Sequence, residues 1–156
     1  MKRILILLSL FLITIFVGER YIKATLNECN IAYTILDEEG NEIENGVIHQ
    51  DAGRAAFAGI TLKDGQMAEF KPDNAVGFLL VANRIIKFTY SMNAKGYMTT
   101  QLYRFQSVRV AKNQSILKGT TLQYTTTTRG YYYALITNDS GSDKNIYGIT
   151  FTSYNP

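Results

Sequence analysis

The chain has 156 residues, of which 46% are hydrophobic, with a formal net charge of +3, one cysteine and one histidine. This length fits a single domain, and the hydrophobic content excludes a wholly disordered chain. Residues 1–24 hold four bases and one acid, so the remainder carries 12 of the 16 bases and 12 of the 13 acids. A neutral remainder predicts no nucleic-acid binding, and a single cysteine excludes an internal disulfide.

The N-terminal segment has the pattern of an export signal. Met1-Lys2-Arg3 is basic, and residues 4–17 are uncharged and almost wholly apolar. A run of fourteen suits a signal-peptide core of about 7–15 residues better than a spanning helix of about 20. We expect residues 1–24 to be a signal peptide. An uncleaved N-terminal anchor is the alternative, because the cleavage site near Ala24 is poor. Either form predicts a secreted or cell-envelope protein.

The first part of the remaining chain predicts strands. Residues 29–36 alternate apolar and polar side chains, and residues 43–49 return after an acidic turn, which predicts a hairpin. Residues 54–62 form a weak strand pattern. The Asp64-Gly65 turn then leads into a short strand at residues 67–70.

The middle of the chain predicts four further strands. Residues 76–82 are nearly continuously apolar, which indicates a strand buried on both faces. Residues 85–92 alternate cleanly. Residues 93–96 then predict a four-residue hairpin loop, with the chain returning through residues 97–105. A short strand at residues 108–110 and a turn at residues 112–114 follow.

Residues 122–137 are the most β-prone stretch. Two runs rich in Thr and Tyr meet at Arg129-Gly130, and glycine tolerates the positive φ of a tight turn. We therefore expect a central hairpin here. Residues 146–154 predict the closing strand, with Tyr147, Ile149 and Phe151 facing inward.

Together these patterns predict an all-β fold. About eight to ten short strands are separated by turn signals, and no helix is expected after the N-terminal hydrophobic segment. The fold class is an antiparallel β-sandwich or jelly roll. We expect a single domain over residues 27–156, preceded by the N-terminal hydrophobic signal or anchor helix.

Charge is divided between the two halves. Residues 25–76 hold ten acids and three bases, whereas residues 77–156 hold nine bases and two acids. Interleaved strands would cancel this division across the surface. The alternative is a polar molecule with an acidic and a basic face, able to stack head-to-tail or to contact an anionic membrane surface.

No catalytic constellation is evident. His49 and Cys29 are the sole residues of their types, and no nucleophile-elbow motif surrounds a serine. We therefore expect neither an enzyme nor a cofactor, with Cys29 as a small buried hydrophobe. Asp139 and Asp143 flank a glycine in a polar loop and are weak calcium candidates, although turn residues have this composition without a metal.

Binding is the function that the sequence favours. Eleven tyrosines are present, and Tyr131 and Tyr133 share one face of their strand while Tyr132 takes the other. Exposed tyrosine rings stack on the apolar faces of sugars, whereas a tyrosine-rich core and boundary layer is the alternative interpretation of the same residues. The predicted ligand-binding residues are Tyr131, Tyr133, Arg129 and Tyr124, with a glycan or a protein as the ligand.

Two other functions stay open. The alternating Thr-rich run at residues 120–128 resembles the hairpins that pore-forming proteins insert into membranes, although its threonine face is polar. A hydrolase is the second alternative, and it would have to use His49.

Overall fold

The computed structural model describes residues 29–50, 59–73 and 75–156. These residues form nine strands and no helix, so no helix among them is long and apolar enough to cross a membrane. The strands are β1 (Cys29–Leu36), β2 (Glu42–Gln50), β3 (Ile60–Leu62), β4 (Met67–Pro72), β5 (Phe78–Leu80), β6 (Ile85–Arg104), β7 (Val108–Thr125), β8 (Gly130–Asn138) and β9 (Lys144–Tyr154).

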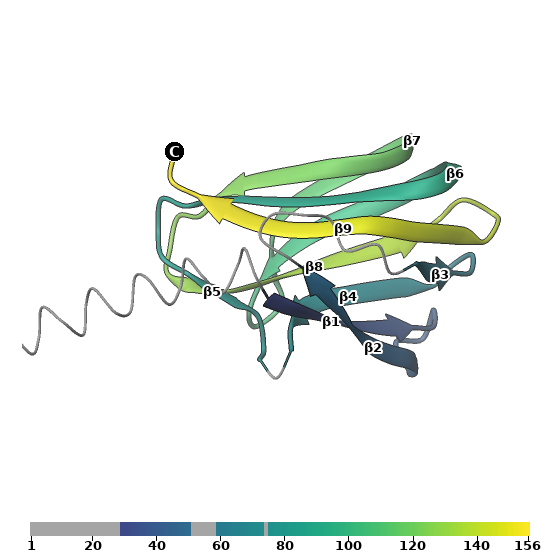
Figure 1. The fold of residues 1–156 in the computed structure, drawn as a ribbon, viewed down its shortest axis with the longest axis horizontal. Coiled ribbons are helices and arrows are strands. Elements are labelled where there is room, and N and C mark those ends of the chain that lie inside the picture. Colours follow the sequence, from purple (N-terminus) through teal and green to yellow (C-terminus); the bar gives the residue numbers. More distant parts are fainter. Residues whose placement is uncertain (1–28, 51–58, 74) are drawn as a thin grey trace, which may run out of the picture.

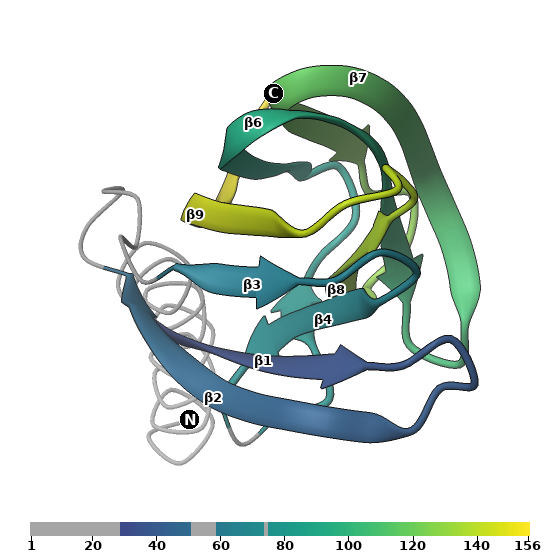
Figure 2. The same ribbon diagram turned by 90° about the vertical axis from the view of Figure 1, so that its right-hand side faces the viewer.

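The strands form one antiparallel sheet that folds over itself into a sandwich (Figures 1 and 2). Residues 98–104 of β6 pair with β8, which continues through β4 and β1 to β2. Residues 85–92 of β6 pair instead with β9, which continues to β3. We call the layer containing β2, β1, β4 and β8 the first layer, and the layer containing β9 and β3 the second layer. The β6–β7 hairpin belongs to both layers.

A break in the β6–β7 ladder lies where this hairpin passes between the layers. The pairing shifts register between Ser91 and Gly96. Opposite Ser91 lies Gly119, whose φ is +155° and whose added Cβ would lie 2.4 Å from the carbonyl oxygen of Tyr90. Only glycine allows the two backbones to approach this closely.

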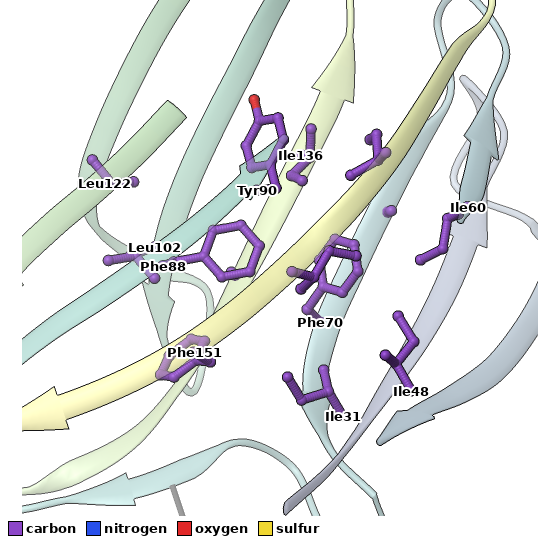
Figure 3. Packing of buried hydrophobic residues seen from close by; sticks show 14 of the residues in the cluster. Ile31, Ile48, Ile60, Phe70, Phe88, Tyr90, Leu102, Leu122, Ile136 and Phe151 are labelled. Atoms are coloured by element: carbon purple, nitrogen blue, oxygen red, sulfur yellow. The ribbon is translucent and has the colours of Figure 1, made fainter. Parts of the chain in front are cut away.

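The core lies between the layers and is filled by side chains at alternate positions. In β6 the even-numbered residues are buried along both halves of the strand. Phe88 lies at the centre, with its ring centroid 5.5 Å from that of Phe70 and 6.0 Å from that of Phe151 (Figure 3). The alternate side chains of β6 that face inward therefore pack into the core from both layers.

Several sequence-based expectations are confirmed. The fold is an all-β sandwich, and the number of strands among the described residues lies in the expected range. The first hairpin forms as β1 and β2, in register from Cys29 opposite Gln50. The signal or anchor at residues 1–24, and most of the weak strand at residues 54–62, fall outside the described residues.

The expected breaks at residues 93–96 and 112–114 are wrong. Both segments lie within long strands, because β6 and β7 pair over almost their whole length. The hairpin turns instead at residues 105–107, where Gln106 and Ser107 have φ values of +75° and +62°. The polar residues in these two segments have the composition of turns, although here they lie within strands. Asn93, for example, accepts a hydrogen bond from the backbone N–H of Asn145.

The central hairpin expected at residues 122–137 is also wrong. Its two halves are β7 and β8, which do not pair, because residues 126–129 carry the chain from the second layer to the first. Thr126 is fully buried, and its hydroxyl accepts the N–H of Arg84 and donates to the carbonyl of Val81. This inter-layer arch satisfies its hydrogen bonds against the β5–β6 turn, so Gly130 needs no positive φ.

Two details of the expected strands also differ. Tyr147 is exposed rather than inward, since Gly148 has a φ of +61° and shifts the alternation of β9 by one residue. The buried strand expected at residues 76–82 is confirmed only for β5, where Phe78 and Leu80 are buried.

Candidate ligand-binding face

Four aromatic rings gather on the outer surface of the first layer. Tyr103 and Tyr133 lie directly opposite each other on β6 and β8, with ring centroids 5.4 Å apart and planes inclined by 12°. Next to them, Phe105 and Tyr131 form an edge-to-face pair with centroids 6.4 Å apart. We call these four residues the aromatic platform. The outer pair is the more open, with Phe105 47% and Tyr131 40% exposed.

The platform follows from the strand period and the pairing register. In β8, Tyr132 and Ala134 are buried in the core, so Tyr131 and Tyr133 must project from the opposite face. The neighbouring odd-numbered residues of β6 project the same way. The N–H of Phe105 donates to the carbonyl of Tyr131 at 2.8 Å and extends the pairing beyond the end of β6.

Polar side chains lie beside the platform on the same face. On β4, the ammonium of Lys71 lies 2.9 Å from a carboxylate oxygen of Glu69. On β6, Gln101 accepts a hydrogen bond from the hydroxyl of Tyr103 and lies opposite Lys112 of β7. The rings are therefore bordered by hydrogen-bonding groups, which is the composition that fixes the orientation of a polar ligand.

The Tyr133 hydroxyl of the platform stays uncharged at neutral pH. Burial raises the pKa of Tyr133 above its ordinary value, the Glu69 carboxylate raises it further, and a hydrogen bond with Ser107 opposes the rise. A phenol normally ionises near pH 10, so at neutral pH the Tyr133 hydroxyl remains protonated. It is available as both a donor and an acceptor.

The structure separates the four residues that the sequence predicted for binding. Tyr131 and Tyr133 belong to the platform. Tyr124 lies on β7 opposite Ile86, packs partly against the core, and has its ring centroid 6.3 Å from that of Tyr132. Arg129 is exposed in the arch at residues 126–129. Tyr124 and Arg129 therefore lie outside the aromatic platform.

Tyr103 and Phe105 were missed as site residues. The sequence predicted a returning strand at residues 97–105 that contains both, but nothing in the sequence identified β8 as the neighbour of that strand. The mistaken hairpin at residues 122–137 hid this pairing. With the β6–β8 register known, the two aromatic pairs follow from residue numbers alone.

Cys29 and His49 do not form a nucleophile and base. Cys29 faces the core, where burial raises its thiol pKa to about 11. In the ladder it lies opposite Gln50, whereas the exposed His49 lies opposite Asn30 and shares a 2.7 Å hydrogen bond with its side chain. Neighbouring strand positions point to opposite faces, so the two side chains lie on opposite sides of the hairpin.

The polar loop after β8 is organised by an amide. Asn138 is fully buried, and its carboxamide donates to the carbonyls of Leu62 and Ser142. Asp139, one of the two calcium candidates, accepts a hydrogen bond from Thr99, whereas Asp143 is exposed. Within the described ranges, no three His, Cys, Asp or Glu side chains gather as metal ligands. The loop geometry gives the calcium prediction no support.

The Thr-rich run at residues 120–128 lies mainly within β7 of the second layer. Its odd-numbered strand residues, such as Thr121 and Gln123, are exposed, while Leu122 faces the core. The run pairs with β6 and not with the segment that follows it. The self-contained amphipathic hairpin on which the pore-forming alternative depends is therefore not formed in this fold.

The chain was compared with known proteins. No protein-family model matches it, and no curated protein matches it. Among solved structures it is similar to one described as "CBM4 structure and function" (9% identity, TM-score 0.48, covering 78% of this chain and 94% of that one). It is also similar to the CBM22-1–GH10 modules of Clostridium thermocellum endo-1,4-beta-D-xylanase 10B complexed with xylohexaose (14%, 0.43, 83% and 26%).

A third similar structure is TmCBM61 in complex with beta-1,4-galactotriose (7% identity, TM-score 0.42, covering 80% of this chain and 82% of that one). This chain spans about a quarter of the xylanase structure and most of the other two. At these identities and TM-scores, the likenesses assign neither a family nor a ligand to this chain.

Proposed function

We propose that this protein is a non-catalytic glycan-binding module that holds a neutral polysaccharide against the aromatic platform. The observation that carries the proposal is the two-by-two arrangement of Tyr103, Phe105, Tyr131 and Tyr133 on one sheet face. Aromatic rings offer large apolar surfaces, and three of these four rings also carry hydroxyls, of which that of Tyr103 donates to the side chain of Gln101. A sugar presents the matching combination of apolar ring faces and hydroxyl groups.

The charges on the β4 side of the platform favour a neutral ligand, because Glu69 and Lys71 are paired with each other and the Tyr133 hydroxyl is protonated at neutral pH. On the β7 side, Arg109 and Lys112 lie opposite Tyr103 and Gln101, so an anionic polysaccharide is the comparison ligand. A protein partner is the alternative ligand. A stable protein interface needs about 800 Å² on each side with an apolar centre, whereas this platform is small and bordered by polar groups.

We also propose that the module works outside the cytoplasm, in the cell envelope or as a secreted protein. The support is the N-terminal sequence, with its basic start and fourteen-residue apolar run. A polysaccharide ligand fits that location.

A binding panel tests the proposed function. The full chain is incubated with insoluble neutral polysaccharides that differ in sugar and linkage, with an anionic polysaccharide included for comparison, and the bound fraction is measured by sedimentation. We expect binding to at least one neutral polymer and a marked loss for Tyr131→Ala. Tyr154→Ala is the matched control, because Tyr154 is 42% exposed on the second layer. Binding to no neutral polymer, or equal loss in both variants, would overturn the proposal.

A further inference from the structure

The two long edge strands of the first layer have no neighbouring strand on their outer side among the described residues. β2 pairs with β1 alone, and β7 pairs with β6 alone. In Figure 2, β2 runs along the bottom of the molecule, while β7 arches over the right-hand side and the top. An unpaired edge presents backbone N–H and C=O groups that can pair with another strand.

The two edges carry opposite charge. Residues 29–50, which form the β1–β2 hairpin, hold five acids and neither lysine nor arginine. β7 holds three bases and no acid, and Arg109, Lys112 and Lys118 are all exposed. The division of charge along the sequence therefore survives folding as an acidic edge and a basic edge.

Both edges also expose large apolar side chains. Ile43 and Val47 of β2 are 52% and 53% exposed. Val108 and Ile116 of β7 are 42% and 64% exposed. Ile116 is the most open of the large hydrophobic residues in the described part of the chain. Each edge thus combines apolar surface with charge of a single sign.

We infer that copies of this chain associate head-to-tail, with the β2 edge of one copy alongside the β7 edge of the next. Two β2 edges repel each other, and so do two β7 edges, because either contact would place like charges together. This repulsion does not prevent contact between β2 and β7, where the charges attract. The partner of the β2 edge is accordingly the β7 edge of a second copy, and the partner of the β7 edge is the β2 edge of another.

Such a contact is heterologous, so an open row of copies of any length keeps one β2 edge free at one end and one β7 edge free at the other. Association of this type continues into a filament or closes into a ring. The aromatic platform lies on the face of the sheet, not at either edge, and would remain exposed along the assembly. Repeated platforms would raise the avidity for a polymeric ligand without any new contact.

Sedimentation velocity of the full chain tests this inference, in the absence of glycan. We expect the weight-average mass to rise with protein concentration at low ionic strength and to fall toward one copy at high salt, because salt screens exposed charges. A wild-type chain that stays at the mass of one copy at all concentrations would overturn the inference while leaving the glycan-binding proposal untouched.

Charge reversal identifies the edges. Variant A carries Glu42→Lys and Glu44→Lys, and variant B carries Arg109→Glu and Lys112→Glu. Each should remain a single copy alone. In variant A the strand β2 changes from two acids to two lysines while β7 keeps its three bases, and in variant B β7 holds two acids and one base while β2 stays acidic. An equal mixture of A and B should recover association, as should the chain that carries all four changes. The recovery also shows that the variants are folded.

Lys63→Glu with Lys87→Glu is the matched control, because both lysines are exposed, neither lies on an edge strand, and the net charge changes as in variant B. Every variant keeps residues 1–28, so association through that segment would be equal in all of them. Association of A and B as strong as that of the wild type would overturn the inference, as would a mixture that fails to recover.

Discussion

The arch between β7 and β8 depends on one hydroxyl group. Thr126 is fully buried, and its hydroxyl lies 2.9 Å from the amide nitrogen of Arg84 and 2.7 Å from the carbonyl oxygen of Val81. The backbone of Thr126 makes two further hydrogen bonds, with Asn83 and Arg84. Thr126→Val keeps the shape of the side chain and removes only the hydroxyl. The backbone N–H of Arg84 and the carbonyl of Val81 each lose a partner.

The cost follows from those two groups. An unsatisfied buried donor or acceptor costs about 1–3 kcal/mol, so two partly buried groups give a loss of about 2–4 kcal/mol. For a domain of this size, that loss lowers the melting temperature by on the order of 10 °C. Urea unfolding followed by circular dichroism measures the change in unfolding free energy.

Thr125→Val is the matched control. Thr125 is the adjacent residue and is exposed, so its substitution should change the unfolding free energy by less than about 0.5 kcal/mol. If Thr126→Val is no more destabilising than Thr125→Val, residues 126–129 do not form the arch described here.

Three further predictions concern buried positions. Asn138→Asp should cost about 3–5 kcal/mol in urea unfolding, because it replaces a buried amide that donates to two carbonyls with a carboxylate; a change below about 1 kcal/mol would contradict the assigned hydrogen bonds. Gly119→Ala should cost about 2–4 kcal/mol, because its Cβ would meet the Tyr90 carbonyl at the bend of the β6–β7 hairpin; an alanine variant as stable as the wild type would refute that close approach. Cys29, with a pKa of about 11, should resist thiol reagents near pH 8 until the protein is unfolded, and rapid labelling of the folded chain would show that it is not buried.

Local patterns in the sequence predicted the strands better than their partners. Alternation identified β1, the first half of β6 and the closing strand, because one face of each is buried. It failed at Tyr147, where the positive φ of Gly148 shifts the alternation in a way that residue types do not reveal. The period alone predicted that Tyr132 lies on the face opposite Tyr131 and Tyr133, and in the structure that face is the buried one.

Which strands pair with each other could not be predicted from the sequence. The segment at Arg129-Gly130 has the composition of a hairpin turn. Thr126, however, hydrogen-bonds to the β5–β6 turn, and the chain crosses there from the second layer to the first. The same limit explains half of the site. Tyr131 and Tyr133 were identified from their own strand, whereas Tyr103 and Phe105 are near them only through the β6–β8 register.

The most direct test of glycan binding is an isothermal titration of the full chain with soluble oligosaccharides cut from the neutral polysaccharide that binds best in the panel. Tyr103→Ala removes one ring of the stacked pair and should weaken binding at least about tenfold, equivalent to about 1.4 kcal/mol. Tyr154→Ala, on the second layer, should leave the affinity unchanged. Equal affinities for the wild type and Tyr103→Ala would contradict binding at the aromatic platform.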